Sequence, residues 1–597
     1  MAFQKNEQIT LTVEEVNDTG DGIGRVDGFV VFVKGMLPGE TGLVQIIKVK
    51  SSYAIGRLVS LETTSPFRVE PDCFAFRKGC GGCSFCHLDY DQQLIMKRNR
   101  VVDCLTRIGG FDLSSVTVED TLGEERPFMG RNKSAYPFTL EGKTVRAGFY
   151  ARNSHRVVPL PDTACCLTEK PEMLLVRKNV CRLATDLGYS VYDEQTGRGL
   201  LRHLVVRFSE YSGKAMVILV LTQKSLPREA DFIAALKEAC PFVSSIYVNV
   251  NTLTSNVIFG RVFRLVDGEE YLLNKIGESV FRISPASFYQ VNSRQVEKLY
   301  RTVYAYAKLK GNEKILDLYC GTGTIGLSLL KAYETEHGTC QGLTLAGVEI
   351  VEDAVIDAKE NARMNKLDQA VFLAGDAPEG ADYLLSHGYR PDLVILDPPR
   401  KGCDGTLLDT ICHLMPPRIV YVSCDPATLA RDLKFLCEKG YTFSKVQPVD
   451  MFPMSGHCET VVCLSRQINV HKMKLNSTPF EMIKSGEKTI ELRLYDEKRQ
   501  QVKVGDKIVF TNNTTGETLH STVVKLHRFD NFDELYKTLP LLKCGYTTDN
   551  IDTATPADME QYYSVEEQNK YEVVGIELCR PKEITDECVV GVTREGG

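Results

Sequence analysis

The residues best suited to chemistry lie near the end of a run of alternating strand-like and helix-like segments. Cys424 follows the strand-like segment Arg418-Ile-Val-Tyr-Val422 and stands where a helix is expected to begin. A helix N-terminus and a neighbouring cation such as Arg431 are expected to lower the pKa of this thiol and make it a nucleophile. Glu459 directly precedes the strand-like segment Thr460-Val-Val-Cys-Leu464, where its carboxylate can act as a base.

A cysteine nucleophile and a carboxylate base suit methylation at carbon 5 of a uracil. Carbon 5 attacks a methyl sulfonium poorly, but addition of a thiolate to carbon 6 makes it reactive. The proton on carbon 5 must then be removed so that elimination can release the enzyme. We therefore expect Cys424 to add to carbon 6 and Glu459 to remove the proton, while His457 orients the base or binds substrate.

A glycine loop, Gly321-Thr-Gly323-Thr-Ile-Gly326, follows the predicted strand 314–317 and precedes a helix-like segment. The loop matches the pattern of nicotinamide-binding loops, so an oxidoreductase is one alternative. S-adenosylmethionine is favoured, because the carboxylate of Asp317 suits an ammonium and a sulfonium and would repel a pyrophosphate. Glu349 is placed to bind ribose hydroxyls, and Asp376 is placed to reach the adenine amine.

The fourth predicted strand ends in the acidic turn Asp397-Pro-Pro-Arg400. Open α/β sheets hold their ligands at this carboxyl edge. Enzymes that methylate exocyclic amines use a similar turn followed by an aromatic residue. Here Arg400 occupies the position of that aromatic residue. This difference favours a carbon atom as the methyl acceptor. A doubly wound, mainly parallel sheet is predicted from strands at 314–317, 345–349, 370–373, 392–396 and 418–422.

A cysteine motif lies in a glycine-rich segment nearer the N-terminus. Its members are Cys73, Cys80, Cys83 and Cys86. Thiolates at this spacing suit an iron–sulfur cluster or tetrahedral zinc, and the spacing alone does not choose between them. A second pair, Cys165 and Cys166, could close the site. The alternative is that the motif consists of unrelated buried cysteines.

Composition sets the broader expectations. A chain of 597 residues predicts several domains, and a net charge of −7 does not by itself point to a nucleic-acid partner. With 20 cysteines and no long apolar segment, we expect a cytoplasmic protein with reduced thiols and no membrane partner.

We predict a multidomain α/β protein. The predicted domains are a small OB-like β-barrel at 1–62, a central α+β domain with the cysteine motif at 63–278, a Rossmann-like methyltransferase domain at 279–467 and an appended domain at 471–597.

Over roughly residues 8–467 the sequence resembles the RNA uracil-C5 methyltransferases. The matching motifs are Phe281-Arg-Ile-Ser-Pro-Ala-Ser-Phe-Tyr-Gln290-Val-Asn292, Asp317-Leu-Tyr-Cys-Gly-Thr-Gly-Thr324, Asp397-Pro-Pro-Arg-Lys-Gly402, Ser423-Cys424-Asp-Pro426 and Asp450-Met-Phe-Pro453 with Glu459. The resemblance implies that Cys424 is the nucleophile and Glu459 the base. It also implies an S-adenosylmethionine site formed by Gln290, Tyr319, Thr324, Glu349, Asp376 and Asp397.

The N-terminal segment is similar to a TRAM domain, an RNA-binding module, and the cysteine motif resembles the 4Fe–4S site of the branch that acts on 23S ribosomal RNA. The implied cluster ligands are Cys73, Cys80, Cys83 and Cys165, with Cys166 as the neighbouring candidate. If Cys86 closes the site instead, zinc becomes the better fit.

The resemblance implies an enzyme that forms 5-methyluridine in 23S ribosomal RNA, and we expect it to be a monomer. Two alternatives stay open. One is the same chemistry on tRNA, and the other is an RNA-binding or assembly factor that has lost activity.

The last block resembles an ASCH domain, a PUA-like β-barrel. The resemblance rests on Ser485-Gly-Glu-Lys488-Thr-Ile-Glu491-Leu-Arg493, Val504-Gly-Asp506 and Tyr562-Tyr-Ser-Val-Glu-Glu567. It implies a second RNA-binding domain. Some relatives of this fold resemble small amidohydrolases, which makes Lys488 and Thr489 candidate catalytic residues.

Overall fold

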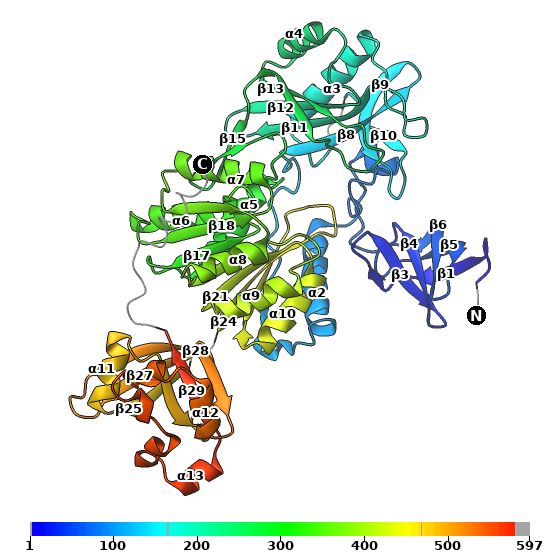
Figure 1. Ribbon diagram of the computed structural model, residues 1–597. Helices are drawn as coiled ribbons and strands as arrows, with labels where there is room; N and C mark the ends of the chain where they lie inside the picture. The colour runs from blue at the N-terminus through cyan, green and yellow to red at the C-terminus, as the bar shows by residue number, and fades with distance from the viewer. Residues whose placement is uncertain (1–2, 164–165, 467–468, 580–597) are drawn as a thin grey trace. The chain divides into compact units, whose positions relative to one another are not determined.

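The computed structural model describes residues 3–163, 166–466 and 469–579 (Figure 1). Its contacts divide the chain into two compact units. The first comprises Met1–Asp382, Pro391–Cys412 and Arg418–Ser465, and the second comprises Tyr383–Arg390, His413–Pro417 and Arg466–Gly597. Among the described residues, no helix is long and apolar enough to cross a membrane.

The N-terminal segment forms a six-stranded sheet in the order β1-β5-β6-β4-β3-β2. Its strands are β1 (Gln8–Thr12), β2 (Glu15–Val16), β3 (Asp21–Val26), β4 (Phe29–Lys34), β5 (Thr41–Val49) and β6 (Tyr53–Thr63). Alternate residues of β5 are buried, so one face of the sheet covers a small core that contains Leu11, Val31 and Val44. The predicted β-rich character of this segment is confirmed.

The central region is built on a seven-stranded sheet in the order β10-β9-β8-β11-β12-β13-β14. Its strands are β8 (Lys133–Glu141), β9 (Thr144–Tyr150), β10 (Val157–Pro159), β11 (Leu201–Ser209), β12 (Lys214–Leu221), β13 (Val243–Val250) and β14 (Val262–Gly268). Its helices are α1 (Phe74–Arg77), α3 (Pro171–Asp186) and α4 (Glu229–Ala239). The helix α2 (Tyr90–Arg107), which precedes β8 in the chain, packs instead against α10 (Pro426–Glu438). Every residue of β11 is buried, which marks this strand as the centre of the region.

The next region carries a nine-stranded sheet whose main path is β19-β18-β17-β20-β21-β24-β23-β7, with β22 paired to β24. The strands are β7 (Thr117–Val118), β17 (Lys314–Leu318), β18 (Thr344–Glu349), β19 (Ala370–Ala374), β20 (Leu393–Leu396), β21 (Arg418–Ser423), β22 (Tyr441–Thr442), β23 (Lys445–Val449) and β24 (Glu459–Arg466). The five predicted strands are confirmed, and all five run parallel. No sequence pattern predicts that β7, far upstream, adds to the edge of this sheet.

Helices cover both faces of this sheet, and the strand order reverses beside β17. The helices are α5 (Ser293–Ala307), α6 (Thr324–His337), α7 (Glu352–Met364), α8 (Ala377–Ser386), α9 (Gly405–Leu414) and α10 (Pro426–Glu438). Figure 1 shows α5, α6 and α7 on one face and α10 on the other. A hairpin of β15 (Leu272–Ile276) and β16 (Ser279–Ile283) packs against α7. The crevice outside the carboxyl ends of β17 and β20 is therefore the expected ligand site.

The second unit contains a five-stranded sheet in the order β25-β27-β28-β29-β26. Its strands are β25 (Val470–Leu475), β26 (Ile490–Leu494), β27 (Lys507–Asn512), β28 (Thr518–Phe529) and β29 (Val573–Leu578). Its helices are α11 (Ser477–Ser485), α12 (Phe532–Thr538) and α13 (Val565–Lys570). Short 3-10 turns are η1 (Leu113–Ser115) in the first unit, and η2 (Leu541–Cys544), η3 (Ile551–Thr553) and η4 (Pro556–Gln561) in the second.

Candidate active site

Asp397, Cys424 and Glu459 stand at the ends of three neighbouring strands. β20 and β21 are parallel, with Leu396 opposite Tyr421, so Asp397 follows β20 at the same edge where Cys424 follows β21. β24 runs antiparallel to β21, with Ser423 opposite Thr460. Glu459, the first residue of β24, is therefore the strand neighbour of Cys424.

Burial controls the charge of the two carboxyls. Glu459 is only 4% exposed, and its Oε2 has no hydrogen-bond partner among the described residues. Burial raises the pKa of both Asp397 and Glu459, and the charge of Asp397 raises the pKa of Glu459 further. Arg400 acts in the opposite direction on the pKa of Glu459. The site thus holds a carboxyl that takes up a proton more readily than an exposed glutamate does.

The expected lowering of the Cys424 pKa is wrong for the ligand-free site. Burial, followed by the charges of Glu459 and Asp397, raises the pKa of the thiol to about 12, against the opposing effects of Arg400 and a backbone hydrogen bond. At the N-terminus of α10, Asp425 acts as the cap and accepts hydrogen bonds from two of the first amides of the helix. Arg431 is also engaged elsewhere, since it pairs with Asp432.

Arg400 and His457 form the rim of this site. The Arg400 Nη2 lies 3.2 Å from Nε2 of His457. Burial and the charge of Arg400 lower the pKa of His457, so the ring is neutral and accepts a hydrogen bond from the guanidinium. The predicted role of His457 in orienting the base stays a prediction, whereas its contact with Arg400 is a finding of the structure.

The glycine loop after β17 is shaped by residues in the left-handed region. Tyr319, Gly321 and Gly323 have φ angles of 62°, 54° and 76°. Glu349 fixes the loop by accepting hydrogen bonds from the amides of Gly321, at 3.0 Å, and Val351, at 2.9 Å. This turn brings the N-terminus of α6 to the edge of the sheet formed by the C-terminal ends of the parallel strands.

Three carboxyls make this edge a poor place for an anion. Asp317 is fully buried and accepts a hydrogen bond from Gly326 N at 3.1 Å. Burial raises the pKa of Asp317 to about 8, and the charges of Asp397 and Glu349 add to the shift. A ligand with positive groups would relieve this repulsion, so the residues present fit S-adenosylmethionine.

The remaining predicted cofactor residues lie around the same edge. Thr324 begins α6, and its hydroxyl lies 2.7 Å from that of Tyr300. Asp376 follows β19 and accepts a hydrogen bond from Ala377 N at 3.0 Å. Gln290 is buried ahead of α5, where its carbonyl accepts a hydrogen bond from Asn132 at 2.9 Å. The side chain of Asn132 thus connects the central sheet to this segment.

Lys97 and Tyr90 support the loop that leads to Glu459, and no sequence motif singled out either residue. They lie on α2 and hold Asp450, which opens the loop before β24. A signal was present, because the polar residues Gln93 and Lys97 fall in the same buried stripe of α2 as Val101.

Comparisons with known proteins decide the family. The family described as tRNA (Uracil-5-)-methyltransferase matches residues 269–467. A protein of Halalkalibacterium halodurans described as an uncharacterized RNA methyltransferase is 42% identical over 460 residues, covering 77% of this chain and 97% of that protein. The chain belongs to the RNA uracil-5 methyltransferase family. A protein of Listeria innocua described in the same words is 41% identical to this methyltransferase over 463 residues, covering 78% of the chain and 98% of its own length.

A solved structure agrees with this assignment. The tRNA (uracil-54, C5)-methyltransferase of Pyrococcus abyssi, in complex with S-adenosyl-L-homocysteine, superposes on the methyltransferase with a TM-score of 0.58 and 27% identity. The match covers 76% of this chain and 100% of that one. A TRAM domain matches residues 2–59 and an ASCH domain matches residues 473–582, as predicted. The protein is thus an S-adenosylmethionine-dependent enzyme with an RNA partner.

The cysteines of the methyltransferase surround a small cavity of the central region. Cys73, Cys80, Cys83 and Cys166 all line it. Cys165 lies outside the described residues. Burial raises the pKa of the Cys80 thiol to about 11, and a hydrogen bond to Cys86 together with burial raises that of Cys83. Within the described ranges, no group of three or more Cys, His, Asp or Glu is arranged to hold a metal ion.

The ASCH region of the methyltransferase has a cavity of about 570 Å³ of its own. Lys488 lines it and pairs with the buried Glu491 at 2.9 Å, and Arg493 pairs with the other oxygen of that carboxylate at 2.8 Å. Thr489 is buried beside them. Lys488 is thus held as the partner of a carboxylate.

Proposed function

We propose that this methyltransferase forms 5-methyluridine in 23S ribosomal RNA, with Cys424 as nucleophile and Glu459 as base. The observation that carries the proposal is the adjacency of Cys424 and Glu459 at the ends of β21 and β24, beside Asp397 and the cofactor edge. A nucleophile and a base on neighbouring strand ends can act on adjacent carbons of one ring.

The reaction begins when Sγ of Cys424 adds to carbon 6 of the uracil and the ring electrons become available at carbon 5. Carbon 5 then takes the methyl group from the sulfonium of S-adenosylmethionine, which leaves as S-adenosylhomocysteine. Glu459 removes the proton from carbon 5, and the electrons of that C–H bond restore the ring as the bond between sulfur and carbon 6 breaks. The thiolate returns unchanged.

The charges of the site support this order of events. In the ligand-free enzyme the thiol of Cys424 stays protonated, because burial, Glu459 and Asp397 raise its pKa. A positively charged sulfonium offsets both carboxylates and favours the thiolate. The nucleophile is therefore formed when the cofactor is bound, which protects the thiol in its absence.

The proposed cofactor residues are Gln290, Tyr319, Thr324, Glu349, Asp376 and Asp397. S-adenosylmethionine supplies the methyl group. Glu349 has the position expected for binding ribose hydroxyls at the end of β18, and Asp397 is close enough to the reacting centre for its charge to act on Cys424. The shared carboxyl edge of β17 to β20 supports the whole set.

The choice of 23S ribosomal RNA rests on the cysteine motif together with the TRAM match. The Pyrococcus abyssi relative acts on tRNA by its title, so tRNA is the second candidate substrate.

One experiment separates these substrates. The enzyme and S-adenosylmethionine are incubated with 23S fragments or tRNA that contain 5-fluorouridine, and adducts that survive denaturation are measured. Fluorine cannot leave as a proton does, so the covalent intermediate accumulates. Cys424→Ala should form no adduct, while Cys437→Ala should behave as the wild type. Adducts with tRNA alone would reject the ribosomal substrate, and binding of RNA without any adduct would favour the inactive factor.

An iron–sulfur cluster is a further part of the proposal. The proposed ligands are Cys73, Cys80, Cys83 and Cys165, with Cys166 as the neighbouring candidate and zinc as the alternative ion. Cys73, Cys80, Cys83 and Cys166 line one small cavity, which supports this part of the proposal. Methyl transfer to carbon 5 moves no net electrons between protein and substrate, so we assign the cluster a role in structure or RNA binding.

The domain division also belongs to the proposal. We keep domains at 1–62, 63–278, 279–467 and 471–597, with an OB-like barrel at the first and a PUA-like barrel at the last. The family matches at 2–59, 269–467 and 473–582 support these boundaries. A monomer in the cytoplasm is the expected state, where thiols stay reduced.

A further inference from the structure

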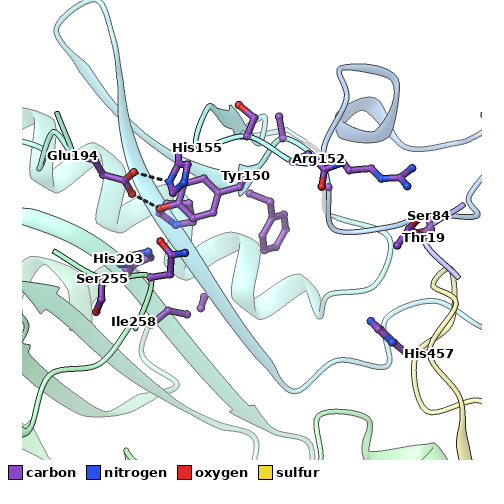
Figure 2. A pocket seen from close by; sticks show the side chains of 18 of the residues that line it. Thr19, Ser84, Tyr150, Arg152, His155, Glu194, His203, Ser255, Ile258 and His457 are labelled. Carbon is purple, nitrogen blue, oxygen red and sulfur yellow. Dashed lines mark hydrogen bonds and ion pairs between the residues drawn. The ribbon is translucent and has the colours of Figure 1, made fainter. Parts of the chain in front are cut away.

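A cavity of about 750 Å³ begins at the loop before β24 and extends over the central sheet (Figure 2). Gly456 and His457 line one end, and Tyr150 and His203 line the other. Its volume falls in the range of about 300–1,000 Å³ that ligand sites span. Because His457 also contacts Arg400 at the rim of the proposed active site, the cavity lies next to the place where the target uracil would react.

One wall of the cavity is an aromatic surface held in place by a carboxylate. Tyr150 donates a hydrogen bond to Glu194 at 3.0 Å, and His155 lies 2.7 Å from the other oxygen of that carboxylate. Figure 2 shows these contacts on the side of the cavity away from His457. The Tyr150 ring meets the His155 ring edge to face at 5.9 Å. A fixed aromatic surface of this kind suits stacking by a planar ring.

Arg202 brings an uncompensated positive charge to the cavity. It is 7% exposed and donates to the carbonyls of Asn251, at 2.9 Å, and Leu253, at 2.6 Å. Within the described ranges it forms no ion pair with a carboxylate, and its Nε has no hydrogen-bond partner. Its guanidinium carbon lies 4.5 Å from the centre of the Tyr192 ring. A buried cation with only neutral partners attracts an anion such as a phosphate.

His203 offers a polar atom that the protein itself does not use. It is 9% exposed on β11, and among the described residues its Nδ1 has no hydrogen-bond partner. Burial and the neighbouring Arg202 lower its pKa to about 4, so the ring is neutral. A neutral imidazole can donate or accept one hydrogen bond at a base edge.

We propose that this cavity binds a second, unstacked nucleotide of the RNA substrate, close in the chain to the target uridine. The base of this nucleotide stacks on the ring of Tyr150 and forms a hydrogen bond with His203. Its phosphate contacts the guanidinium of Arg202. An aromatic wall, an unused imidazole nitrogen and an uncompensated guanidinium together match the three parts of a nucleotide. The inference rests on the proposed function and adds that the enzyme reads a base it does not methylate.

The first test blocks the cavity from its exposed rim. Ser255 lines the cavity from the exposed loop between β13 and β14, so Ser255→Trp fills space without disturbing the core. Thr254→Trp is the matched control, because Thr254 is an exposed neighbour in the same loop and is not among the residues that line the cavity. Both variants are assayed on a fragment that carries the mapped target uridine and on copies with one abasic site at each neighbouring position.

The wild type and Thr254→Trp should lose about tenfold or more in kcat/KM when the base at one non-target position is removed. Ser255→Trp should show a similar loss on the intact RNA and no further loss at that abasic position. Unchanged kcat/KM for Ser255→Trp on intact RNA, or an abasic profile equal to that of the wild type, would overturn the proposal. Equilibrium binding of the same RNAs, measured with S-adenosylhomocysteine present, compares the same proteins without methyl transfer. If the proposed methylation fails, the binding measurements still test whether the cavity holds the second base.

The second test addresses the phosphate. Arg202→Gln removes the charge and keeps a hydrogen-bond donor, and a neutral methylphosphonate replaces one phosphate at a time in the RNA. At the phosphate that Arg202 contacts, the methylphosphonate should weaken binding by the wild type several-fold and leave binding by Arg202→Gln unchanged. Equal weakening of both proteins at every position would contradict the assignment of Arg202, and the thermal transition of the variant shows that it is folded.

Discussion

Lys97 on α2 and Asp450 in the loop before β24 form an ion pair in which both side chains are 0% exposed. Asp450 also accepts a hydrogen bond from Tyr90 at 2.8 Å and one from the amide of Phe452 at 3.2 Å. Lys97 donates to the carbonyl of Phe452 at 3.0 Å. These contacts fix the loop whose far end supplies Glu459.

Removing one partner of this pair should destabilise the fold strongly. Lys97→Met leaves the Asp450 carboxylate buried without its cation, and we expect the free energy of unfolding to fall by about 3–5 kcal/mol. Urea unfolding followed by circular dichroism measures the loss. Lys178→Met, at an exposed lysine of α3, is the control and should change stability by less than about 0.5 kcal/mol. A loss below about 1 kcal/mol for Lys97→Met would show that the pair does not hold the loop.

Glu459→Gln should separate methyl transfer from product release. The amide cannot remove the carbon 5 proton, so turnover should fall by about 10²–10⁴-fold. Methyl transfer itself does not need this base, and a methylated adduct between Cys424 and ordinary uridine RNA should accumulate. Denaturing gels with radiolabelled methyl groups detect it. If labelled product leaves Glu459→Gln at the wild-type rate, another group is the base.

Activity should rise with pH through neutrality. Burial and the charge of Asp397 raise the pKa of Glu459, and the base works only after it has lost its proton. The thiol of Cys424 must also lose its proton, which acts in the same direction. Arg400 lowers the pKa of both groups, so Arg400→Gln should move the rise in kcat/KM to higher pH. A pH profile measured under single-turnover conditions would disprove this account if activity fell across the same range or if the two profiles coincided.

Single substitutions test which cysteine completes the proposed metal site. Cys166 lines the cavity shared by Cys73, Cys80 and Cys83, so Cys166→Ala should lose bound metal and its visible absorption. Cys86→Ala should keep both, since Cys86 is not among the residues that line that cavity. Metal analysis also separates iron from zinc. Metal loss in Cys86→Ala but not in Cys166→Ala would show that Cys86 is the fourth metal ligand.

Much of the catalytic sheet follows from the sequence alone. Its strands and helices alternate in the chain, and Asp397 and Cys424 each follow a strand, so parallel packing must gather them at one edge. Glu459 joins them because it begins the strand next to that of Cys424. The chemistry of a nucleophile, a base and an acidic cofactor edge could thus be inferred from residue types at strand ends.

Only the tertiary structure decided how these groups are charged and held. The raised pKa of Cys424 depends on burial and on carboxyls from two other strands, which no local pattern reveals. Lys97 and Asp450 are 353 residues apart in the chain, and the cavity beside His457 joins segments from several elements. Periodicity reports which face of one element is buried, but contacts between distant elements exist only once the chain has folded. The sequence therefore predicts the reaction, whereas the electrostatics of the site and the cavity beside it depend on the fold.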